Sequence, residues 1–296
     1  MTARLLDGKA VAQQMRAELA AEVAALRGRG VVPGLGVLLV GDNPASRVYV
    51  TAKERACGDL GLYSSEVRLP ASASRDQILD AVGAFNRDER IHGILVQLPL
   101  PDASMEPHVL EAMNPAKDVD GFHPVNVGKA VLGLPAFLPC TPHGILQLLR
   151  RSGISIAGAH VVVIGRSRIV GRPLATLLSQ KGEGGNATVT LCHTATRDLA
   201  AHTRRADIVI AAAGRPDTVR ADMIREGAVV VDVGMNRVPD PSAPRGYRLI
   251  GDVAFDEVRE KAAWITPVPG GVGPMTITML LFNTVAAARG GPSGSP

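Results

Sequence analysis

The stretch VVVIGRSRIVGRPL, residues 161–174, decides the fold of the second half of this chain. Its first four residues are apolar and predict a buried strand, Gly165 and Gly171 bound a tight turn, and Pro173 lies at the start of a predicted helix. In such a strand–turn–helix unit the unpaired N–H groups of the helix N-terminus face the turn and bind a pyrophosphate. Ser167 replaces the middle glycine of the G-x-G-x-x-G pattern, so an ordinary turn between strand and helix stays open as the alternative.

The charges near this turn favour NADP over NAD as the dinucleotide. An NAD site usually carries Asp or Glu at the end of the second strand, where the carboxylate binds the ribose 2′-hydroxyl and repels a 2′-phosphate. Here that strand, predicted over Thr188 to Cys192, is followed by His193 and Thr194. Guanidinium groups, which bind phosphate through paired hydrogen bonds, surround the first turn instead: Arg166, Arg168 and Arg172. A solvated helix face is the alternative role for these arginines.

Strand-like apolar runs alternate with helical segments along the whole chain, which predicts an α/β protein with helices on a parallel sheet. Predicted strands cover residues 35–40, 64–69, 93–98, 161–164, 188–192, 208–212 and 229–233, with a short one near Leu249. Predicted helices cover residues 8–28, 45–59, 75–86, 143–151 and 275–288. Residues 114–142 are rich in Gly, Pro and Asn and mark a connection between two domains. The sequence DVGMN, residues 232–236, follows the fourth strand of the second half, where a nicotinamide would rest.

Composition excludes several classes of function. The net charge of +4 and the 3% of aromatic residues suit neither a groove that follows phosphates nor a surface that stacks bases, so nucleic acid is not an expected partner. The three cysteines are scattered and the seven histidines are far apart, which predicts no disulfide and no metal site. No apolar run is long enough to span a membrane, and residues 1–9 do not resemble a secretory signal. We therefore expect a cytoplasmic protein without membrane contact.

A second glycine-rich segment, ITPVPGGVGPMT at residues 265–276, precedes an apolar helical run. Prolines restrict φ and glycines lack a Cβ, so this backbone can lie against a flat ligand while its ends stay rigid. Pro274 is predicted at the first helical position, with N–H groups at the helix start directed toward the loop. We interpret the segment as a binding loop; an ordinary turn between strand and helix is the alternative.

The first half of the chain carries a set of polar side chains suited to proton transfer. Tyr49 and Lys53 are four residues apart on a predicted helix and share one face. Gln97 interrupts an apolar strand near its end, where a buried amide needs partners. Asp120 adds a carboxylate in the connecting segment, and Cys140 is placed to line a cleft. The alternatives are a surface lysine beside a half-buried tyrosine, a turn-forming aspartate and a small buried residue at a hinge.

Six motifs, taken together and in order, carry a resemblance to a known family. They are YxxxK at 49–53, VQLPLP at 96–101, KDVDG at 117–121, PCTP at 139–142, GRS at 165–167 and PGGVGP at 269–274. With these motifs the chain resembles the bifunctional methylenetetrahydrofolate dehydrogenase / methenyltetrahydrofolate cyclohydrolase family over residues 5–288.

The resemblance implies a homodimeric, cytosolic, NADP-dependent enzyme of one-carbon metabolism and purine biosynthesis. It implies a folate-binding catalytic domain at residues 1–140, joined by a returning helix at 274–289. A Rossmann-like NADP domain at 141–268 lies across a cleft from it, and we expect a disordered tail at 290–296. The substrate is 5,10-methylenetetrahydrofolate, which is oxidised to the methenyl form and then hydrolysed to 10-formyltetrahydrofolate.

The resemblance also implies roles for single residues. Lys53 is the proton-transfer group, Gln97 supports it, Tyr49 stacks on the aminobenzoyl ring of the folate, and Asp120 holds the pterin. Further substrate contacts fall on Val96 and Leu98 and on a covering loop of Pro269, Gly270, Gly271 and Val272. Cofactor contacts fall on Gly165, Arg166, Ser167, Thr194 and Met235.

The chain departs from the family pattern at four places. Lys53-Glu54-Arg55 replaces the common Lys-x-Lys, Thr194 replaces a frequent serine, Met235 stands where isoleucine is common, and the connection at 182–186 looks expanded. A short-chain dehydrogenase, which also uses Tyr-x-x-x-Lys, is the rival enzyme, but there the glycine-rich turn precedes the Tyr/Lys helix. A non-enzymatic nucleotide-binding module is the other alternative, and it would leave Lys53 and Asp120 without a role.

Overall fold

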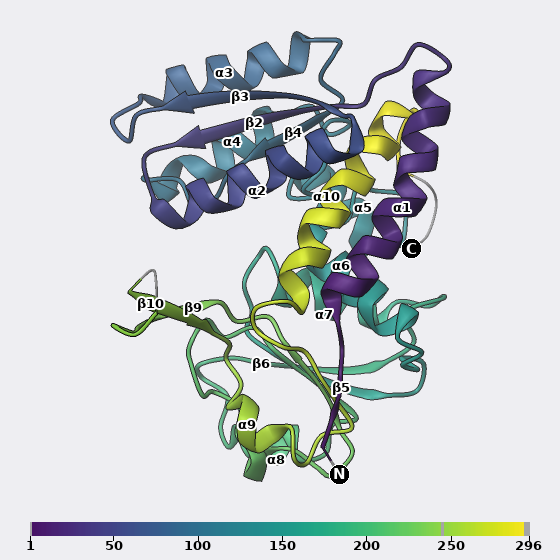
Figure 1. Cartoon of the computed structure of the whole chain (residues 1–296), viewed down its shortest axis with the longest axis vertical. Coiled ribbons are helices and arrows are strands. Elements are labelled where there is room, and N and C mark those ends of the chain that lie inside the picture. The colour runs from purple at the N-terminus through teal and green to yellow at the C-terminus, as the bar shows by residue number, and fades with distance from the viewer. Residues whose placement is uncertain (1, 244–245, 293–296) are drawn as a thin grey trace. The chain divides into compact units, whose positions relative to one another are not determined.

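The structure is a computed structural model that describes residues 2–243 and 246–292 (Figure 1). The described residues form two compact units, one of residues 2–13 and 141–276 and the other of residues 14–140 and 277–292. Most of the tail predicted to be disordered, residues 293–296, lies outside the described residues. Gly290 and Gly291 lie within them and donate backbone hydrogen bonds to Ala287 and Ala286, which close the end of the last helix.

The unit of residues 2–13 and 141–276 is built on a six-stranded sheet within the described part of the chain, in the order β1-β11-β8-β7-β5-β6. All neighbouring strands are parallel. The strands are β1 (Arg4–Leu5), β5 (His160–Ile164), β6 (Thr188–Cys192), β7 (Ile208–Ala211), β8 (Val229–Asp232) and β11 (Trp264–Ile265). Strands β5, β7 and β8 are runs of Val, Ile and Ala whose residues are nearly all buried, as expected when helices cover both faces of a parallel sheet. The predicted α/β class with a Rossmann-like second domain is confirmed.

Strand order in this sheet reverses beside β5. The chain runs from β5 through α7 (Gly171–Ser179) to β6 on one side, then through α8 (Leu199–Thr203) to β7 on the other side of β5. In open parallel sheets, ligands bind outside the carboxyl ends of the strands at such a switch point. We call this rim, formed by the segments that follow β5, β6, β7 and β8, the carboxyl edge.

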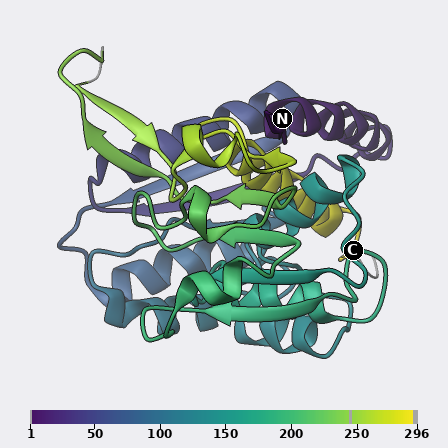
Figure 2. The same ribbon diagram turned by 90° about the horizontal axis from the view of Figure 1, so that it is seen from below.

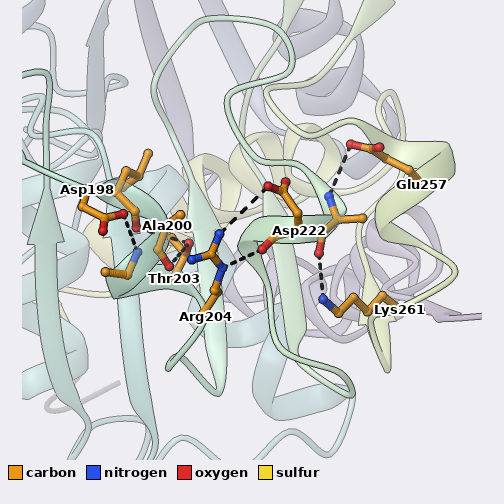
Figure 3. A network of polar contacts seen from close by, with 10 residues as sticks. Asp198, Ala200, Thr203, Arg204, Asp222, Glu257 and Lys261 are labelled. Atoms are coloured by element: carbon orange, nitrogen blue, oxygen red, sulfur yellow. Dashed lines mark hydrogen bonds and ion pairs between the residues drawn. The ribbon is translucent and has the colours of Figure 1, made fainter.

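Polar contacts tie together the helices that follow β6, β7 and β10 (Figure 3). Arg204, which caps α8, donates from Nε to the backbone oxygen of Asp222 at 2.8 Å in the 3₁₀ turn η2 (Ala221–Met223). The backbone of Ala221 is held from the other side: its N–H donates to Glu257 of α9 (Phe255–Val258), and its oxygen accepts from Lys261 Nζ at 3.0 Å. These exposed contacts are individually weak, but together they fix η2 between α8 and α9.

An antiparallel hairpin of β9 (Asn236–Pro239) and β10 (Tyr247–Ile250) projects from this unit (Figure 2). The guanidinium of Arg237 lies 4.8 Å from the centre of the Tyr247 ring, a cation–π contact between the two strands. The sequence predicted only the short strand near Leu249, because the polar β9 has no apolar alternation.

The other unit contains a three-stranded parallel sheet in the order β3-β2-β4, formed by β3 (Tyr63–Leu69), β2 (Gly34–Val40) and β4 (Gly93–Val96). The connection from β2 to β3 contains α2 (Pro44–Leu60), and the connection from β3 to β4 contains α3 (Arg75–Arg87) and crosses the sheet in the opposite direction. Because such connections are right-handed, the two helices lie on opposite faces of the sheet (Figure 1). A capping box of Ser74 and Gln77 begins α3. The remaining elements of this part of the chain are η1 (Ala103–Met105), α4 (Glu106–Ala112) and α5 (Pro124–Val131).

Three further helices are α1 (Gly8–Arg27), α6 (Cys140–Arg151) and α10 (Val272–Ala288). The prediction that Pro274 is the first helical residue is wrong, because α10 begins two residues earlier. Proline is tolerated there because its missing N–H falls in the first turn, where N–H groups have no partner within the helix. No helix among the described residues has the length and apolar character needed to cross a membrane.

Candidate functional site

Lys53 and Gln97 meet at the end of β4 although they are 44 positions apart in sequence. The Nζ of Lys53, on α2, donates to Gln97 Oε1 at 3.0 Å, and Gln97 Nε2 donates to the backbone oxygen of Leu98 at 2.8 Å. The second bond orients the amide so that its oxygen faces the lysine. Gln97 is itself placed by its N–H, which donates to Leu38 of β2. Lys53 is only 8% exposed.

Burial shifts the pKa values of Lys53 and of two neighbouring groups, Asp120 and Cys140. Loss of water lowers the pKa of Lys53 itself, and the negative charge of Asp120 and Cys140 opposes this. Burial raises the pKa of Asp120, and the charge of Lys53 counteracts that rise. The pKa of the Cys140 thiol lies well above its usual value because the thiol is buried and Asp120 is beside it. Burial therefore favours the uncharged amine, which is the form of Lys53 that accepts a proton.

The loop that carries Asp120 is organised by Asp118, to which sequence reasoning gave no role. Asp118 is fully buried, and its carboxylate accepts hydrogen bonds from the backbone N–H groups of Gly121, Phe122 and His123. A fourth bond comes from Asn126 Nδ2 at 2.9 Å. These bonds fold the chain around Asp120, which lies in the sequence between Asp118 and its three backbone donors.

Asn283 on α10 is a second residue that sequence reasoning missed. Its Nδ2 donates to the backbone oxygens of Val119 at 2.8 Å and Leu138 at 3.1 Å. The Cys140 thiol donates to the same Val119 oxygen at 3.3 Å. The segments before Asp120 and before Cys140 are thus joined to α10, and only a three-dimensional structure reveals this, because the residues are far apart along the chain.

Three more of the predicted substrate residues, Tyr49, Val96 and Leu98, belong to the same unit as Lys53. Tyr49 is half-buried and lies one helical turn before Lys53 on α2. Val96 is buried as the last residue of β4, and Leu98 is partly exposed just beyond it. Tyr49 thus adds an aromatic ring to the helix that carries Lys53, and Val96 and Leu98 add apolar side chains on either side of Gln97 in the sequence.

The turn after β5 is shaped for close approach to a ligand. Gly165 has φ +116°, and a Cβ there would overlap the backbone oxygen of Ala212, which follows β7. A Cβ on Gly171 would overlap the oxygen of Gly165. Ser167 Oγ accepts hydrogen bonds from the N–H groups of Val170 and Gly171 at the start of α7. The turn therefore lies directly on the switch point, with a helix N-terminus beside it.

The residues predicted to bind a dinucleotide gather at the carboxyl edge, since β5, β6 and β8 are parallel. Arg166 and Ser167 are exposed after β5, Thr194 is exposed after β6, and Met235 is 38% exposed after β8. The segment from His193 to Thr196 forms a tight turn without an acidic residue. The close glycine contacts, the exposed side chain of Arg166 and the lack of a carboxylate after β6 fit a dinucleotide that carries a 2′-phosphate.

Two backbone hydrogen bonds hold the loop from Pro269 to Val272. Gly270 has φ +116° and accepts a backbone hydrogen bond from Lys9 at 3.1 Å, and Gly271 donates to Pro267 at 2.9 Å. A Cβ on Gly271 would be 2.7 Å from the Pro267 oxygen, so only glycine fits without displacement. The loop leads into α10, where a Cβ on Gly273 would lie 3.5 Å from the terminal methyl of Met235.

Comparison with known proteins matches nearly the whole chain. The catalytic domain of tetrahydrofolate dehydrogenase/cyclohydrolase matches residues 6–120, and the NAD(P)-binding domain of the same family matches residues 139–291. The bifunctional protein FolD of Syntrophus aciditrophicus is 58% identical, and the alignment covers 98% of each chain. The solved FolD structure from Campylobacter jejuni is 48% identical with a TM-score of 0.90, and covers 97% of this chain and 98% of its own.

A second solved structure comes from Trypanosoma brucei. It is the methylenetetrahydrofolate dehydrogenase-cyclohydrolase complexed with NADP and an inhibitor. It is 44% identical, with a TM-score of 0.92, and covers 98% of each chain.

The close contact at Gly165 predicts a large effect of adding one methyl group. We expect Gly165→Ala to lower the free energy of unfolding by more than about 3 kcal/mol, because it combines an unfavourable φ with overlap onto Ala212. Gly227→Ala is the matched control: its φ is +74° but no atom lies within 4 Å, so we expect a loss of about 1 kcal/mol. Urea unfolding followed by circular dichroism measures both, and equal losses would contradict the contact.

Proposed function

Because the chain belongs to the tetrahydrofolate dehydrogenase/cyclohydrolase family, we propose that Lys53 is the proton-transfer group of its active site. The protein is a bifunctional enzyme: it oxidises 5,10-methylenetetrahydrofolate to 5,10-methenyltetrahydrofolate with NADP, and hydrolyses that product to 10-formyltetrahydrofolate. The observation that supports the role of Lys53 is its burial at 3.0 Å from Gln97 Oε1, with a lowered pKa.

The dehydrogenase step needs orientation more than it needs acid or base. Bound NADP accepts the hydride from the methylene carbon, and the cation that forms is stabilised by the two nitrogens of the substrate itself. We propose that Tyr49 stacks on the aminobenzoyl ring and that Asp120 holds the pterin, with Val96, Leu98 and the loop from Pro269 to Val272 as further contacts. Correct orientation of two bound reactants accounts for most of such a rate enhancement.

We propose that the cofactor is held at the carboxyl edge. Gly165 and Ser167 would admit the pyrophosphate to the start of α7, and Arg166 with Thr194 would bind the 2′-phosphate. A guanidinium binds phosphate through two parallel hydrogen bonds, and a hydroxyl adds a third. Met235 would contact the nicotinamide side.

The cyclohydrolase step needs a base. Water attacks the methenyl carbon, and the uncharged amine of Lys53 takes the proton that water loses. Lys53 then returns this proton to one of the two nitrogens as the bond from the carbon to that nitrogen breaks. The hydroxyl left on the carbon releases its own proton to solvent as the C=O bond forms, so the formyl group stays on the other nitrogen. A general base typically contributes about 10²- to 10⁴-fold to the rate.

Gln97 suits this role because it is neutral. Its oxygen holds Nζ without adding negative charge, whereas a carboxylate at the same distance would stabilise the ammonium and raise the pKa of Lys53. The Tyr-x-x-x-Lys pair lies on α2, in the unit that does not contain the Rossmann-like sheet. In this it differs from the pair of a short-chain dehydrogenase.

We further propose that residues 1–140, with the returning helix at 274–289, form the folate-binding domain and that the protein acts in the cytoplasm, supplying one-carbon units for purine biosynthesis. We also propose that it is a homodimer. Sedimentation equilibrium tests the last point: a mass of about twice 30.9 kDa is expected, and a monomer at micromolar concentration would contradict it.

Replacing Lys53 by methionine removes the base but keeps the length of the side chain. We expect Lys53→Met to lower the rate of methenyltetrahydrofolate hydrolysis by about 10²- to 10⁴-fold. Lys129→Met, on the exposed surface of α5, is the matched control and is expected to hydrolyse at the rate of the unmodified protein. Loss of the methenyl absorbance measures both, and full hydrolysis by Lys53→Met would overturn the assignment.

A charge at Gln97 should move the pH profile of hydrolysis. The base must be unprotonated, so the rate rises with pH through the pKa of Lys53, which lies below its usual value. In Gln97→Glu a carboxylate next to Nζ favours the ammonium, and we expect the rising limb to shift by about 1 to 3 pH units to higher pH. The profile of kcat/KM, corrected for uncatalysed hydrolysis, measures this. An unchanged limb would show that another group is the base.

A further inference from the structure

Two buried carboxylates lie behind the carboxyl edge and have no part in the Lys53 site. Asp232 is the last residue of β8 and is 2% exposed, and Asp252 precedes α9 and is fully buried. Neither carboxylate forms an ion pair within residues 2–243 and 246–292. Burial raises the pKa of Asp232 to about 7, which reflects the cost of keeping a charge in this place.

Asp252 holds two segments of the carboxyl edge at once. Its Oδ2 accepts hydrogen bonds from the backbone N–H groups of Ala213 at 2.6 Å and Gly214 at 2.8 Å, in the loop after β7. Its Oδ1 accepts from Asn236 Nδ2 at 2.9 Å, and Asn236 follows Met235 in the segment after β8. One carboxylate thus connects the loops after two neighbouring strands.

Asp232 fixes Asp252 in turn. Its Oδ1 accepts from the N–H of Asp252 at 2.8 Å and from that of Gly234 at 2.9 Å, and its Oδ2 accepts from Val253 at 3.0 Å. A Cβ on Gly234 would overlap the carboxylate of Asp252, so the two segments touch with no room for a side chain. Both oxygens of Asp232 accept backbone N–H groups, and those of Asp252 accept two backbone N–H groups and the Asn236 amide, which makes the arrangement rigid.

The loop that Asp252 holds is exposed on one side and held by hydrogen bonds on the other. Ala213 and Gly214 are exposed on the outside while their N–H groups point inward to Asp252. Ala212, just before them, is in contact with the Gly165 turn at the switch point. Farther along, the same segment is held at η2 by the contacts of Arg204 and Lys261 (Figure 3). The loop is therefore restrained at both ends and beneath.

We infer that Asp252 is a positioning residue for the dehydrogenase reaction, which holds the Ala213–Gly214 loop and the Met235 segment in place for the nicotinamide end of NADP. The inference rests on the proposed cofactor site at the carboxyl edge. Backbone N–H groups alone would be satisfied by a neutral acceptor. A charged acceptor gives shorter and stronger bonds, at the cost of burying its charge. That cost is consistent with a role in function as well as in folding.

The test uses the whole protein and compares NADP with a fragment of it that lacks nicotinamide, 2′-phospho-ADP-ribose. We expect Asp252→Ala to lower kcat/KM for NADP by about 100-fold, because the ring is no longer oriented. Affinity for the fragment should stay within about twofold, since the phosphate contacts come from other segments. Hydrolysis of methenyltetrahydrofolate without NADP should also stay within about twofold. Glu226→Ala, an exposed acid before β8, is the matched control and should leave all three values unchanged.

Asp252→Asn distinguishes positioning from general destabilisation and carries the test if the alanine variant does not fold. Its amide oxygen still accepts from Ala213 and Gly214, but as a neutral group, so we expect a loss of only about fivefold in kcat/KM for NADP. Full activity with NADP in Asp252→Ala would overturn the inference; if only Asp252→Asn folds, full activity of that variant would do so. An equal loss in kcat/KM for NADP and in affinity for the fragment would also overturn it. An unmodified protein that fails to reduce NADP with methylenetetrahydrofolate would instead contradict the proposed function.

Discussion

The burial of one amine is the constraint on which the Lys53 site depends. Lys53 carries a group that is charged in water, and α2 holds it where little water reaches it. Loss of water favours the neutral form of the amine and, by the same cause, the neutral forms of Asp120 and Cys140. The charges of Lys53 and Asp120 oppose this, so the state of each group depends on the other. The group that accepts the hydrogen bond of this amine is a neutral amide, that of Gln97, which adds no negative charge to favour the ammonium form.

Much of the fold could be predicted from periodicity because the strands of a doubly covered parallel sheet are short apolar runs. Residues 161–164 and 188–192 are predicted to within one residue of β5 and β6. The elements that escaped prediction have no such pattern. Strands β1 and β11 are only two residues long, and they are defined by their pairing: β1 pairs with β11, and β11 pairs with β8. Helix α5 lies in a segment rich in Gly, Pro and Asn, where Pro124 and the cap of His123 start a helix that composition does not suggest.

Site residues could be predicted where they share a motif in one short segment. Contacts between residues that are far apart in the sequence could not. Helical spacing put Tyr49 and Lys53 on one face, but the burial of Lys53 follows from packing that spacing does not describe. The bond from Lys53 to Gln97 depends on the register of β4 against β2. Asp118 and Asp252 bind backbone N–H groups, and such a partner leaves no mark in the sequence because every residue except proline has an N–H.

The carboxylates Asp118, Asp120 and Asp252 divide into two kinds, and the division follows their partners. Asp120 is beside an amine and a thiol, so its charge changes how they titrate. Asp118 and Asp252 accept mainly backbone N–H groups, so each of them fixes the shape of a loop. The loop that Asp118 fixes carries Asp120, whereas the loops that Asp252 fixes belong to the carboxyl edge. Asp120 is proposed to hold the pterin, which both reactions use, whereas Asp252 is proposed to position the dinucleotide. Because hydrolysis requires no dinucleotide, only the second of these roles is specific to one of the two reactions.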